Sequence, residues 1–372
     1  MDDWKQIELN DACSRLSSGK SISAKYVTSE GIYPIYGGNG IRGYTDIYNF
    51  DGECAIIGRQ GAYCGNVRYF SGKAYMTEHA VVTCGNESSN TRFLAYLLST
   101  MQLGRLSGQS AQPGLSVKTI GQQVIKLPPL KVQNIIADML TALDEKIEVN
   151  ESINKNLMEQ ALTLYTTHFT TLEKNGCIGD YCSIKSGFAF KSSWWTDSGI
   201  KVIKIGSINQ DNLNLLECSY VDENKINKVN DFKVRAGDLL IAMTGTIGKF
   251  AMVPYSSETL LVNQRVGKFF LGNKPVEKLP FIYCTLKQPD VYYEIVNRGQ
   301  GSAQPNISGS DIMSIPCVIP SKEAIDEFNC INQPLFDLII SNQRENQQLS
   351  KIRDTILPKL MSGELDVSDI DL

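Results

Sequence analysis

The sequence predicts an α+β protein with two β-rich modules in a pseudo-twofold arrangement, separated by an antiparallel two-helix coiled coil. Three observations support this prediction. A short motif occurs twice at a large separation, two regions are rich in glycine, tyrosine and β-branched residues, and a long helical stretch follows each of those regions. Together these patterns indicate a duplicated chain rather than a single domain.

The internal repeat is the strongest of these signals. The stretch from Ser107 to Ser116 returns with few changes from Arg298 to Ser308, and Ser110 falls on Ser302 at a shift of 192 residues. A unit of that length is far longer than the repeats of solenoid proteins. Each copy is therefore expected to be a domain-sized module with its own site.

We expect the first module at residues 1–128 and the second at 176–320. In the first, short apolar bursts are broken by glycine-containing turns, which is typical of strands, and a helix is expected from Thr91 to Leu103. Two weaker matches support the duplication. Asp11 begins a motif that returns at Asp180, and Gly52 begins one that returns at Gly237.

Long helices are expected at residues 129–175 and 321–363, followed by a tail at 364–372. Apolar or small residues recur there at alternating steps of three and four, and in the first helix they continue through Ala161 and Leu164, which is the pattern of a coiled-coil seam. Pro334 could bend or delay the second helix. The predicted seam consists of Ile136, Leu140, Leu143, Ile147, Asn150, Asn154 and Leu157 in the first helix, and of Leu335, Ile339, Asn342, Asn346, Leu349, Ile356 and Leu360 in the second.

The asparagines of the seam predict how the helices pair. An asparagine at a seam position is best satisfied by another asparagine, so we expect Asn150 opposite Asn346 and Asn154 opposite Asn342. The residue numbers of both pairs add to 496, which only an antiparallel pairing allows. The alternative is that each stripe packs only on its own module. One mismatch places Leu143 opposite Arg353, whose head is expected to reach water.

The composition is that of a globular protein, with 42% hydrophobic and 20% charged residues. No run approaches the roughly 18 apolar residues that a membrane span needs, and the first residues do not resemble an export signal. We therefore expect a cytoplasmic protein with reduced cysteines. Cys177 and Cys182 lack a second ligand pair for zinc, so no metal site is predicted.

Motifs for catalysis are largely missing. The glycine-containing stretches at Leu16–Ser21 and Thr244–Lys249 lack the spacing of a phosphate-binding loop. The two histidines are His79, beside Glu78, and His168, which falls on the predicted seam. An enzyme that uses His79 and Glu78 stays open as one alternative, although the second copy has Gln264 and Arg265 near the equivalent place.

Polar loops in both modules carry residue types that recognise base edges in DNA. The net charge of −4 hides a slight basic excess in each module, with 12 basic against 10 acidic residues in the first and 15 against 13 in the second. Residues that read different sequences should differ between the copies. The candidates are Asn39, Arg42, Tyr44, Arg59, Gln60 and Tyr63 in the first module, and Trp194, Trp195, Thr244, Thr246, Lys249, Gln264 and Arg265 in the second.

The whole chain resembles the specificity subunit of type I restriction-modification systems. The resemblance rests on the alternation of module and helix, on the repeated GlnSerAlaGlnPro-like motif before each helix, and on the ending from Leu357 to Leu365. It implies that each module is a target recognition domain for one half of a split double-stranded DNA sequence. The helices would then be a spacer that fixes the gap, at about one helical turn of DNA, roughly 34 Å.

The resemblance also implies the partners. Methyltransferase (M) subunits and a restriction and translocation (R) subunit would carry the catalysis, with S-adenosylmethionine, ATP and Mg on those subunits and no cofactor in this chain. Residues identical in both copies, such as Gln112 with Gln304 and Ser110 with Ser302, would serve architecture, phosphate contact or docking. A stand-alone homodimeric DNA-binding regulator is the main alternative, and a tandem ligand-binding or adhesion protein is another.

Overall fold

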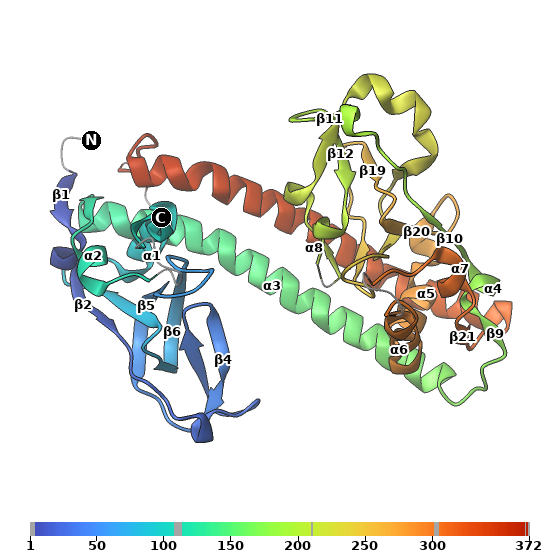
Figure 1. Cartoon of the computed structure of the whole chain (residues 1–372), viewed down its shortest axis with the longest axis horizontal. Helices are drawn as coiled ribbons and strands as arrows, with labels where there is room; N and C mark the ends of the chain where they lie inside the picture. Colours follow the sequence, from blue (N-terminus) through green and yellow to red (C-terminus); the bar gives the residue numbers. More distant parts are fainter. Residues whose placement is uncertain (1–3, 108–113, 210, 301–304, 369, 371–372) are drawn as a thin grey trace. The chain divides into compact units, whose positions relative to one another are not determined.

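The computed structural model describes residues 4–107, 114–209, 211–300, 305–368 and 370. The chain forms two compact units, here called unit 1 (1–144 with 351–372) and unit 2 (145–350). Each contains one β-rich module and part of both long helices, α3 (Leu130–Phe169) and α8 (Lys322–Ser362) (Figure 1). Within the described ranges, no helix is long and apolar enough to cross a membrane.

Unit 1 is built on a six-stranded sheet in the order β2-β7-β5-β6-β3-β4, antiparallel except where β3 runs parallel to β6. The strands are β2 (Cys13–Ser18), β3 (Tyr33–Gly37), β4 (Gly40–Thr45), β5 (Phe50–Gly58), β6 (Val67–Met76) and β7 (Ala80–Gly85). A separate pair joins β1 (Lys5–Glu8) to β8 (Val124–Leu127). The helices are η1 (Leu9–Ala12), η2 (Ala24–Tyr26), α1 (Thr91–Thr100), η3 (Leu103–Leu106) and α2 (Val117–Gly121).

Helix α1 covers one face of this sheet and matches the helix expected from the sequence. It begins after Asn90, whose side chain accepts a hydrogen bond from the Phe93 amide at 2.9 Å and so caps the first turn. Strand β5 alternates between two cores, since Ala55 and Ile57 pack with α1 while Cys54 and Ile56 pack on the opposite face. The β5 strand therefore holds the module together from both sides.

Unit 2 contains two sheets. A four-stranded sheet has the order β10-β20-β17-β18, from β10 (Ser183–Ser186), β17 (Leu239–Ala242), β18 (Phe250–Met252) and β20 (Val266–Phe270). A five-stranded sheet has the order β11-β15-β12-β19-β16, from β11 (Trp195–Thr196), β12 (Ile200–Ile203), β15 (Ser219–Val221), β16 (Lys233–Val234) and β19 (Leu260–Val262). Two short pairs are β13 (Ile208–Asn209) with β14 (Asn212–Leu213), and β21 (Pro316–Cys317) with β9 (Gly176–Cys177).

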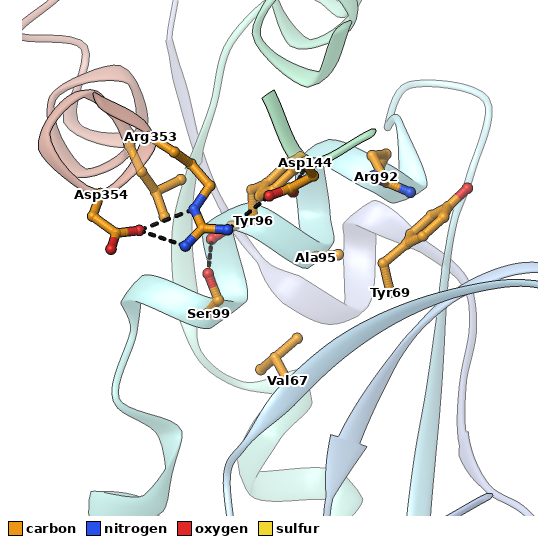
Figure 2. Close-up of a pocket in the computed structure, with 10 residues that line it drawn as sticks. Val67, Tyr69, Arg92, Ala95, Tyr96, Ser99, Asp144, Arg353 and Asp354 are labelled. Carbon is orange, nitrogen blue, oxygen red and sulfur yellow. Dashed lines mark hydrogen bonds and ion pairs between the residues drawn. The ribbon is translucent and has the colours of Figure 1, made fainter. Parts of the chain in front are cut away.

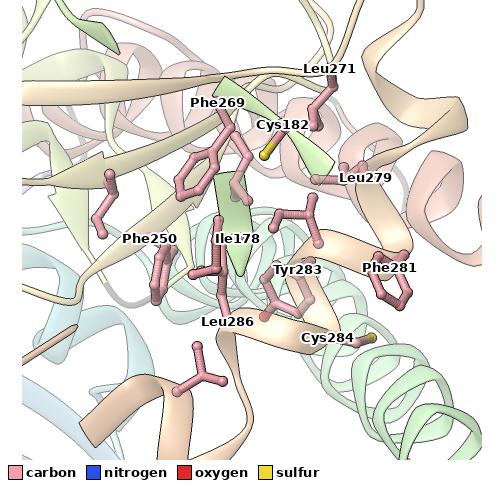
Figure 3. Close-up of a cluster of buried hydrophobic side chains, with 14 of the residues drawn as sticks. Ile178, Cys182, Phe250, Phe269, Leu271, Leu279, Phe281, Tyr283, Cys284 and Leu286 are labelled. Atoms are coloured by element: carbon pink, nitrogen blue, oxygen red, sulfur yellow. The ribbon is translucent and has the colours of Figure 1, made fainter. Parts of the chain in front are cut away.

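Helices cover the four-stranded sheet of unit 2. They are α4 (Ile178–Tyr181), α5 (Leu279–Leu286), α6 (Pro289–Arg298) and α7 (Gly309–Met313). The short helices of unit 2 are η4 (Ser192–Trp194), η5 (Ile205–Ser207), η6 (Leu215–Glu217), η7 (Glu223–Lys228), η8 (Asn230–Phe232) and η9 (Pro275–Glu277). Strand residues Phe250 and Phe269 and helix residues Phe281 and Tyr283 belong to one large buried core (Figure 3). This core also includes segments of α3 and α8.

The two units share a common framework, as the duplication predicts. Strands β2, β5, β6 and β7 correspond to β10, β17, β18 and β20 in the same sheet order. The short helix α2 begins at Val117 and α7 begins at Gly309, while the long helix α3 begins at Leu130 and α8 begins at Lys322. Each of these offsets is 192 residues, the shift of the sequence repeat. The frameworks differ in the segment after the first strand. In unit 1, β3 and β4 lie between β2 and β5, whereas in unit 2 most strands of the five-stranded sheet lie between β10 and β17.

One predicted match is out of register by a residue. Pairing Gly52 with Gly237 would place Ala55 on Leu240, whereas in the structure Ala55 corresponds to Leu239. The evidence is that Gly58 pairs with Ala80 in unit 1 and Ala242 pairs with Val266 in unit 2. Leu239 also packs in the core that contains the helices, as Ala55 does. Since side chains alternate along a strand, the one-residue error would move every side chain to the wrong face.

The predicted antiparallel pairing of the long helices is confirmed. In unit 2, Asn150 Nδ2 donates to Asn346 Oδ1 at 2.8 Å, and Asn342 Nδ2 donates to Asn154 Oδ1 at 2.8 Å. In unit 1, Leu140 and Leu360 are fully buried in the core of that unit. Helix α8 continues through Pro334, so the predicted delay of its start does not occur.

Three details of the predicted seam are wrong. His168 is exposed and Leu164 is 36% exposed, because the buried stripe at this end of α3 passes through Tyr165 and Phe169 instead. Arg353 does not extend its head into water. Its Nη1 lies 2.8 Å from Asp144 Oδ1 and its Nη2 lies 2.8 Å from Asp354 Oδ1, so the arginine is held in an ion-pair network.

Candidate nucleic-acid interface

In unit 1, three backbone segments meet at the carboxyl end of β5. The Arg59 amide donates to the His79 carbonyl at 2.9 Å, and the Leu115 amide donates to the Arg59 carbonyl at 2.8 Å. Gln60 forms an isolated β-bridge with Gly114. We call this cluster, residues 59–60, 78–79 and 114–115, the first strand-end site.

In unit 2, the same bonds recur with different side chains. The Met243 amide donates to the Arg265 carbonyl at 3.0 Å, and the Ile307 amide donates to the Met243 carbonyl at 2.9 Å. Thr244 bridges Asn306, and its hydroxyl lies 3.0 Å from Asn306 Oδ1. Residues 243–244, 264–265 and 306–307 form the second strand-end site.

The two sites therefore share a backbone and differ in chemistry. Arg59 corresponds to Met243, Gln60 to Thr244, and the Glu78–His79 pair to Gln264–Arg265. A constant backbone that presents variable polar groups is suited to reading two different sequences. The same correspondence argues against the enzyme alternative, because the His79–Glu78 contact of 3.2 Å is replaced in the second copy by Gln264 and Arg265, which form no acid–base pair.

A serine–glycine corner supports each site, and the sequence analysis missed it. Ser18–Gly19 ends β2 and Ser186–Gly187 ends β10, and a Cβ on either glycine would lie 2.0 or 2.2 Å from a backbone carbonyl oxygen, that of Met76 or Val262. No larger residue fits such an approach. The dipeptide is present in both copies, but a two-residue match was too short to stand out.

In the first module, the tip of the β3–β4 hairpin lies against the strand-end site. A Cβ on Gly38 would be 3.3 Å from both the Gln60 and the His79 carbonyl oxygens. Asn39, at the hairpin tip, and Gln60 are exposed, and Tyr63 is 55% exposed. The structure thus brings Asn39, Arg59, Gln60 and Tyr63 into one region.

Arg42 and Tyr44 lie on β4, beyond that tip. The Arg42 side chain covers Gly37, while Tyr44 is half-buried and its backbone pairs with Thr28. Arg68, which sequence reasoning did not select, lies with its guanidinium 3.3 Å from the Cβ position of Gly40. Only the fold places Arg68, on β6, beside the hairpin.

The exposed arginines give these regions a local positive charge. Among the described residues, Arg42, Arg68 and Arg265 form no ion pair, so their guanidinium groups are available to phosphates or bases. Arg68 also influences its surroundings. Burial raises the pKa of Tyr36, and the nearby Arg68 charge opposes that rise.

The Arg59 side chain is held by hydrogen bonds within the module, unlike an exposed side chain that is free to contact a base. Its Nε donates to the Leu115 carbonyl at 3.0 Å, and its Nη1 lies 3.4 Å from Ser18 Oγ. The side chain is half-buried and holds the backbone near the end of the repeat motif. Arg59 therefore positions a segment of the site.

The two tryptophans predicted to read bases have different surroundings. Trp194 is 8% exposed and packs with Phe188 and Phe190 in the core of the five-stranded sheet, so it has no accessible face, and this prediction is corrected. Trp195 is half-buried, with Lys204 Nζ 3.9 Å from its ring centroid. Both tryptophans were candidate readers, but the core of the five-stranded sheet takes up the Trp194 ring.

The remaining candidates of the second module lie around its strand-end site. Thr244 and the exposed Thr246 occupy the turn after β17, and the Lys249 carbonyl accepts from the Ala242 amide at 2.9 Å. Gln264 and Arg265 are exposed in the turn before β20. The repeat residues Ser110, Gln112, Ser302 and Gln304 lie outside the described residues.

Comparisons with known proteins agree with this architecture. The model of the type I restriction modification DNA specificity domain matches residues 1–159 and 173–351. The MjaIX specificity subunit of Methanocaldococcus jannaschii is 26% identical over 75% of this chain and 70% of that protein. The EcoprrI specificity subunit of Escherichia coli is 40% identical, over 35% of this chain and only 33% of its own length.

A solved structure shows the same fold. The type I restriction-modification S subunit from M. genitalium superposes with a TM-score of 0.61 at 18% identity, over 98% of this chain and 97% of that one. The family is named for DNA specificity rather than catalysis, and two copies of its domain span most of this sequence. The chain belongs to the family of type I restriction-modification DNA specificity subunits, as a non-catalytic recognition component.

Proposed function

We propose that this chain reads a bipartite double-stranded DNA target, with one half-site contacted by each module. The observation that carries the proposal is the repeated strand-end site, in which equivalent backbone hydrogen bonds place Gln60 and His79 in one copy where Thr244 and Arg265 stand in the other. Equivalent scaffolds with unlike polar groups suit two related but different sequences.

The proposed contacts comprise the exposed candidates of each module. Asn39, Gln60, Tyr63, Arg42 and Arg68 serve the first half-site, and Thr244, Thr246, Lys249, Gln264 and Arg265 serve the second. Arg59 holds the Leu115 backbone beside them. The long helices act as the spacer between the half-sites.

The catalytic work belongs to partners in this proposal. The chain directs a methyltransferase subunit to an adenine in each half-site and recruits a restriction and translocation subunit. S-adenosylmethionine, ATP and Mg are bound by those subunits. In the described residues, no three His, Cys, Asp or Glu side chains form a cluster suited to a metal ion.

Mapping methylated adenines in cells that express the chain with its methyltransferase tests the function. The wild type should give one split motif. Arg59→Ala should relax the first half by roughly 1–3 kcal/mol per affected base pair and leave the second unchanged, and Arg265→Ala should do the reverse. A continuous motif, or a motif unchanged in both variants, would refute the half-site assignment.

A gel-filtration experiment separates this proposal from the stand-alone regulator. The regulator would form a homodimer that binds DNA tightly without a methyltransferase. The specificity subunit should instead gain most of its DNA affinity in the complex, because its net charge of −4 offers little long-range attraction to phosphates.

A further inference from the structure

Unit 1 contains a pocket of about 310 Å³ formed by β6, α1 and segments of α3 and α8 (Figure 2). Val67, Arg92, Ala95, Ser99, Asp144 and Arg353 are among its lining residues. It shares no residue with the first strand-end site.

Unit 2 fills the corresponding place with large side chains. Val67 corresponds to Phe250, since Ile57 pairs with Val67 as Ile241 pairs with Phe250. The 192-residue shift places Asp144 on Phe336. The small and polar lining of unit 1 is thus matched by aromatic rings in the copy.

Helices α1 and α5 extend this correspondence. Phe93 and Phe281 are both fully buried near the start of these helices, and aligning them places Ala95 on Tyr283 and Ser99 on Lys287. Tyr283 is 2% exposed, and its ring centroid lies 5.3 Å from that of Phe336. Ala95 therefore leaves open the space that Tyr283 occupies in unit 2.

Unit 2 also places an acidic group at this position. Lys287 Nζ lies 2.6 Å from Asp211 Oδ1. The same nitrogen lies 5.6 Å from the ring centroid of Phe250 and 5.4 Å from that of Tyr283. Asp211 belongs to the turn between β13 and β14 and has a positive φ of 72°. The chain thus satisfies its own cation with an acidic turn.

In unit 1, Ser99 stands at the position of Lys287, and the cations that line the pocket are Arg92 and Arg353. Arg353 is bound by Asp144 and Asp354, and the Tyr96 hydroxyl donates to Asp144 Oδ2 at 2.5 Å. Arg92 packs against the Tyr69 ring, 4.0 Å from its centroid, and forms no ion pair within the described residues. The Tyr69 and Tyr96 rings are its partners, at 4.0 and 5.8 Å, and no carboxylate in the described part of the chain neutralises its charge.

We propose that this pocket receives an acidic side chain on a turn of the methyltransferase subunit, with Arg92 as its counter-ion. This inference rests on the proposed function, which requires that subunit to be held near the DNA that the module contacts. The acidic residue takes the place that Asp211 takes in unit 2, and the space above Ala95 admits it.

The test is assembly of the full chain with its methyltransferase subunit, measured by surface plasmon resonance. Arg92→Gln removes the counter-ion, and Ala95→Tyr fills the pocket with the residue that unit 2 has there. Each should weaken assembly by about tenfold or more. Arg105→Gln, at an exposed arginine of the same unit, is the matched control and should stay within about twofold.

A photo-crosslink from Ser99, which lines the pocket, identifies the occupant. With Ser99→p-benzoylphenylalanine in the assembled complex, mass spectrometry should find a methyltransferase peptide that contains Asp or Glu. A crosslink only to neutral segments overturns the proposal. The proposal is also overturned if both pocket variants are folded, as judged by thermal unfolding, and assemble as well as the wild type.

Two further outcomes distinguish this proposal from a small-molecule site and from failure of the proposed function. Citrate could raise the melting temperature of the wild type but not of Ala95→Tyr, while Ala95→Tyr assembles with the methyltransferase like the wild type. In that case the pocket binds a small carboxylate and the docking proposal is wrong. If the wild type itself does not assemble with the methyltransferase, the proposed function fails, and this inference fails with it.

Discussion

Asn342 donates its side-chain amide to Asn154 Oδ1 over 2.8 Å, and both residues are at most 8% exposed. Replacing Asn342 by Leu leaves a buried amide without a partner, so we expect a loss of about 1–3 kcal/mol in the free energy of unfolding. The double variant Asn154→Leu and Asn342→Leu should recover most of that loss, because apolar pairs suit a seam. Urea unfolding of the three variants measures both effects, and a double variant less stable than either single one would contradict the argument.

A buried ion pair in unit 2 gives a second prediction. Asp238 and Lys268 are 2% and 13% exposed, and their charged atoms lie 2.6 Å apart. Burial raises the pKa of Asp238, and Lys268 opposes that rise. Lys268→Met should destabilise the protein by about 3 kcal/mol at neutral pH, because the carboxylate then stays buried without its partner.

The pH dependence of that variant follows from linkage. A carboxyl group whose pKa is raised in the folded state binds its proton more tightly there than in the unfolded state, so protonation favours folding. The deficit of Lys268→Met relative to the wild type should therefore shrink as the pH falls through the raised pKa. Denaturation curves at pH 7.5 and pH 5 test this, with Asp238→Asn in the same background as the control. A deficit that grows on acidification would be inconsistent with this explanation.

The sequence was sufficient for the framework because repeated residues mark repeated structure. The asparagine pairs specified the direction and register of the helices, since a polar group in a seam tolerates few partners. Near the end of α3, heptad spacing alone selected Leu164 and His168, but contacts with the module turned Tyr165 and Phe169 inward instead. Tertiary packing decided which face of the helix was buried.

The candidate site was less predictable for the same reason. Arg68 and Gly40 are distant in sequence and meet only in the folded module. Trp194 looked like a recognition residue because aromatic residues serve both cores and interfaces. A pattern of residue types cannot separate these roles without the sheet that buries one ring and exposes its neighbour.

Cysteine reactivity offers a third prediction. Burial raises the pKa of Cys54 and of Cys182 to about 12, whereas Cys330 is exposed on α8. Only the thiolate reacts with iodoacetamide, so at pH 8 the native protein should be modified at Cys330 while Cys54 and Cys182 stay unmodified. Peptide mapping should show all ten cysteines modified after unfolding in guanidinium chloride. Rapid labelling of Cys54 in the native state would contradict the buried position of β5.

The serine–glycine corners give a fourth prediction, which links the framework to recognition. A Cβ at residue 19 would lie 2.0 Å from the Met76 carbonyl oxygen, whereas one at Gly114 would meet nothing within 4 Å. Gly19→Ala should therefore cost roughly 2 kcal/mol or more in stability, because β2 must move away from the β6–β7 turn. Gly114→Ala is the matched control and should unfold like the wild type.

The functional consequence separates the corner from a general packing role. Because Ser18 lies beside Arg59, displacing the corner should weaken recognition of the first half-site and leave the second unchanged. Adenine methylation mapping at a temperature where the variant remains folded would show this difference. Gly187→Ala, which places a Cβ 2.2 Å from the Val262 carbonyl oxygen, should weaken the other half-site instead. Equal loss at both halves from either variant would mean that the corners support the whole chain rather than one reader each.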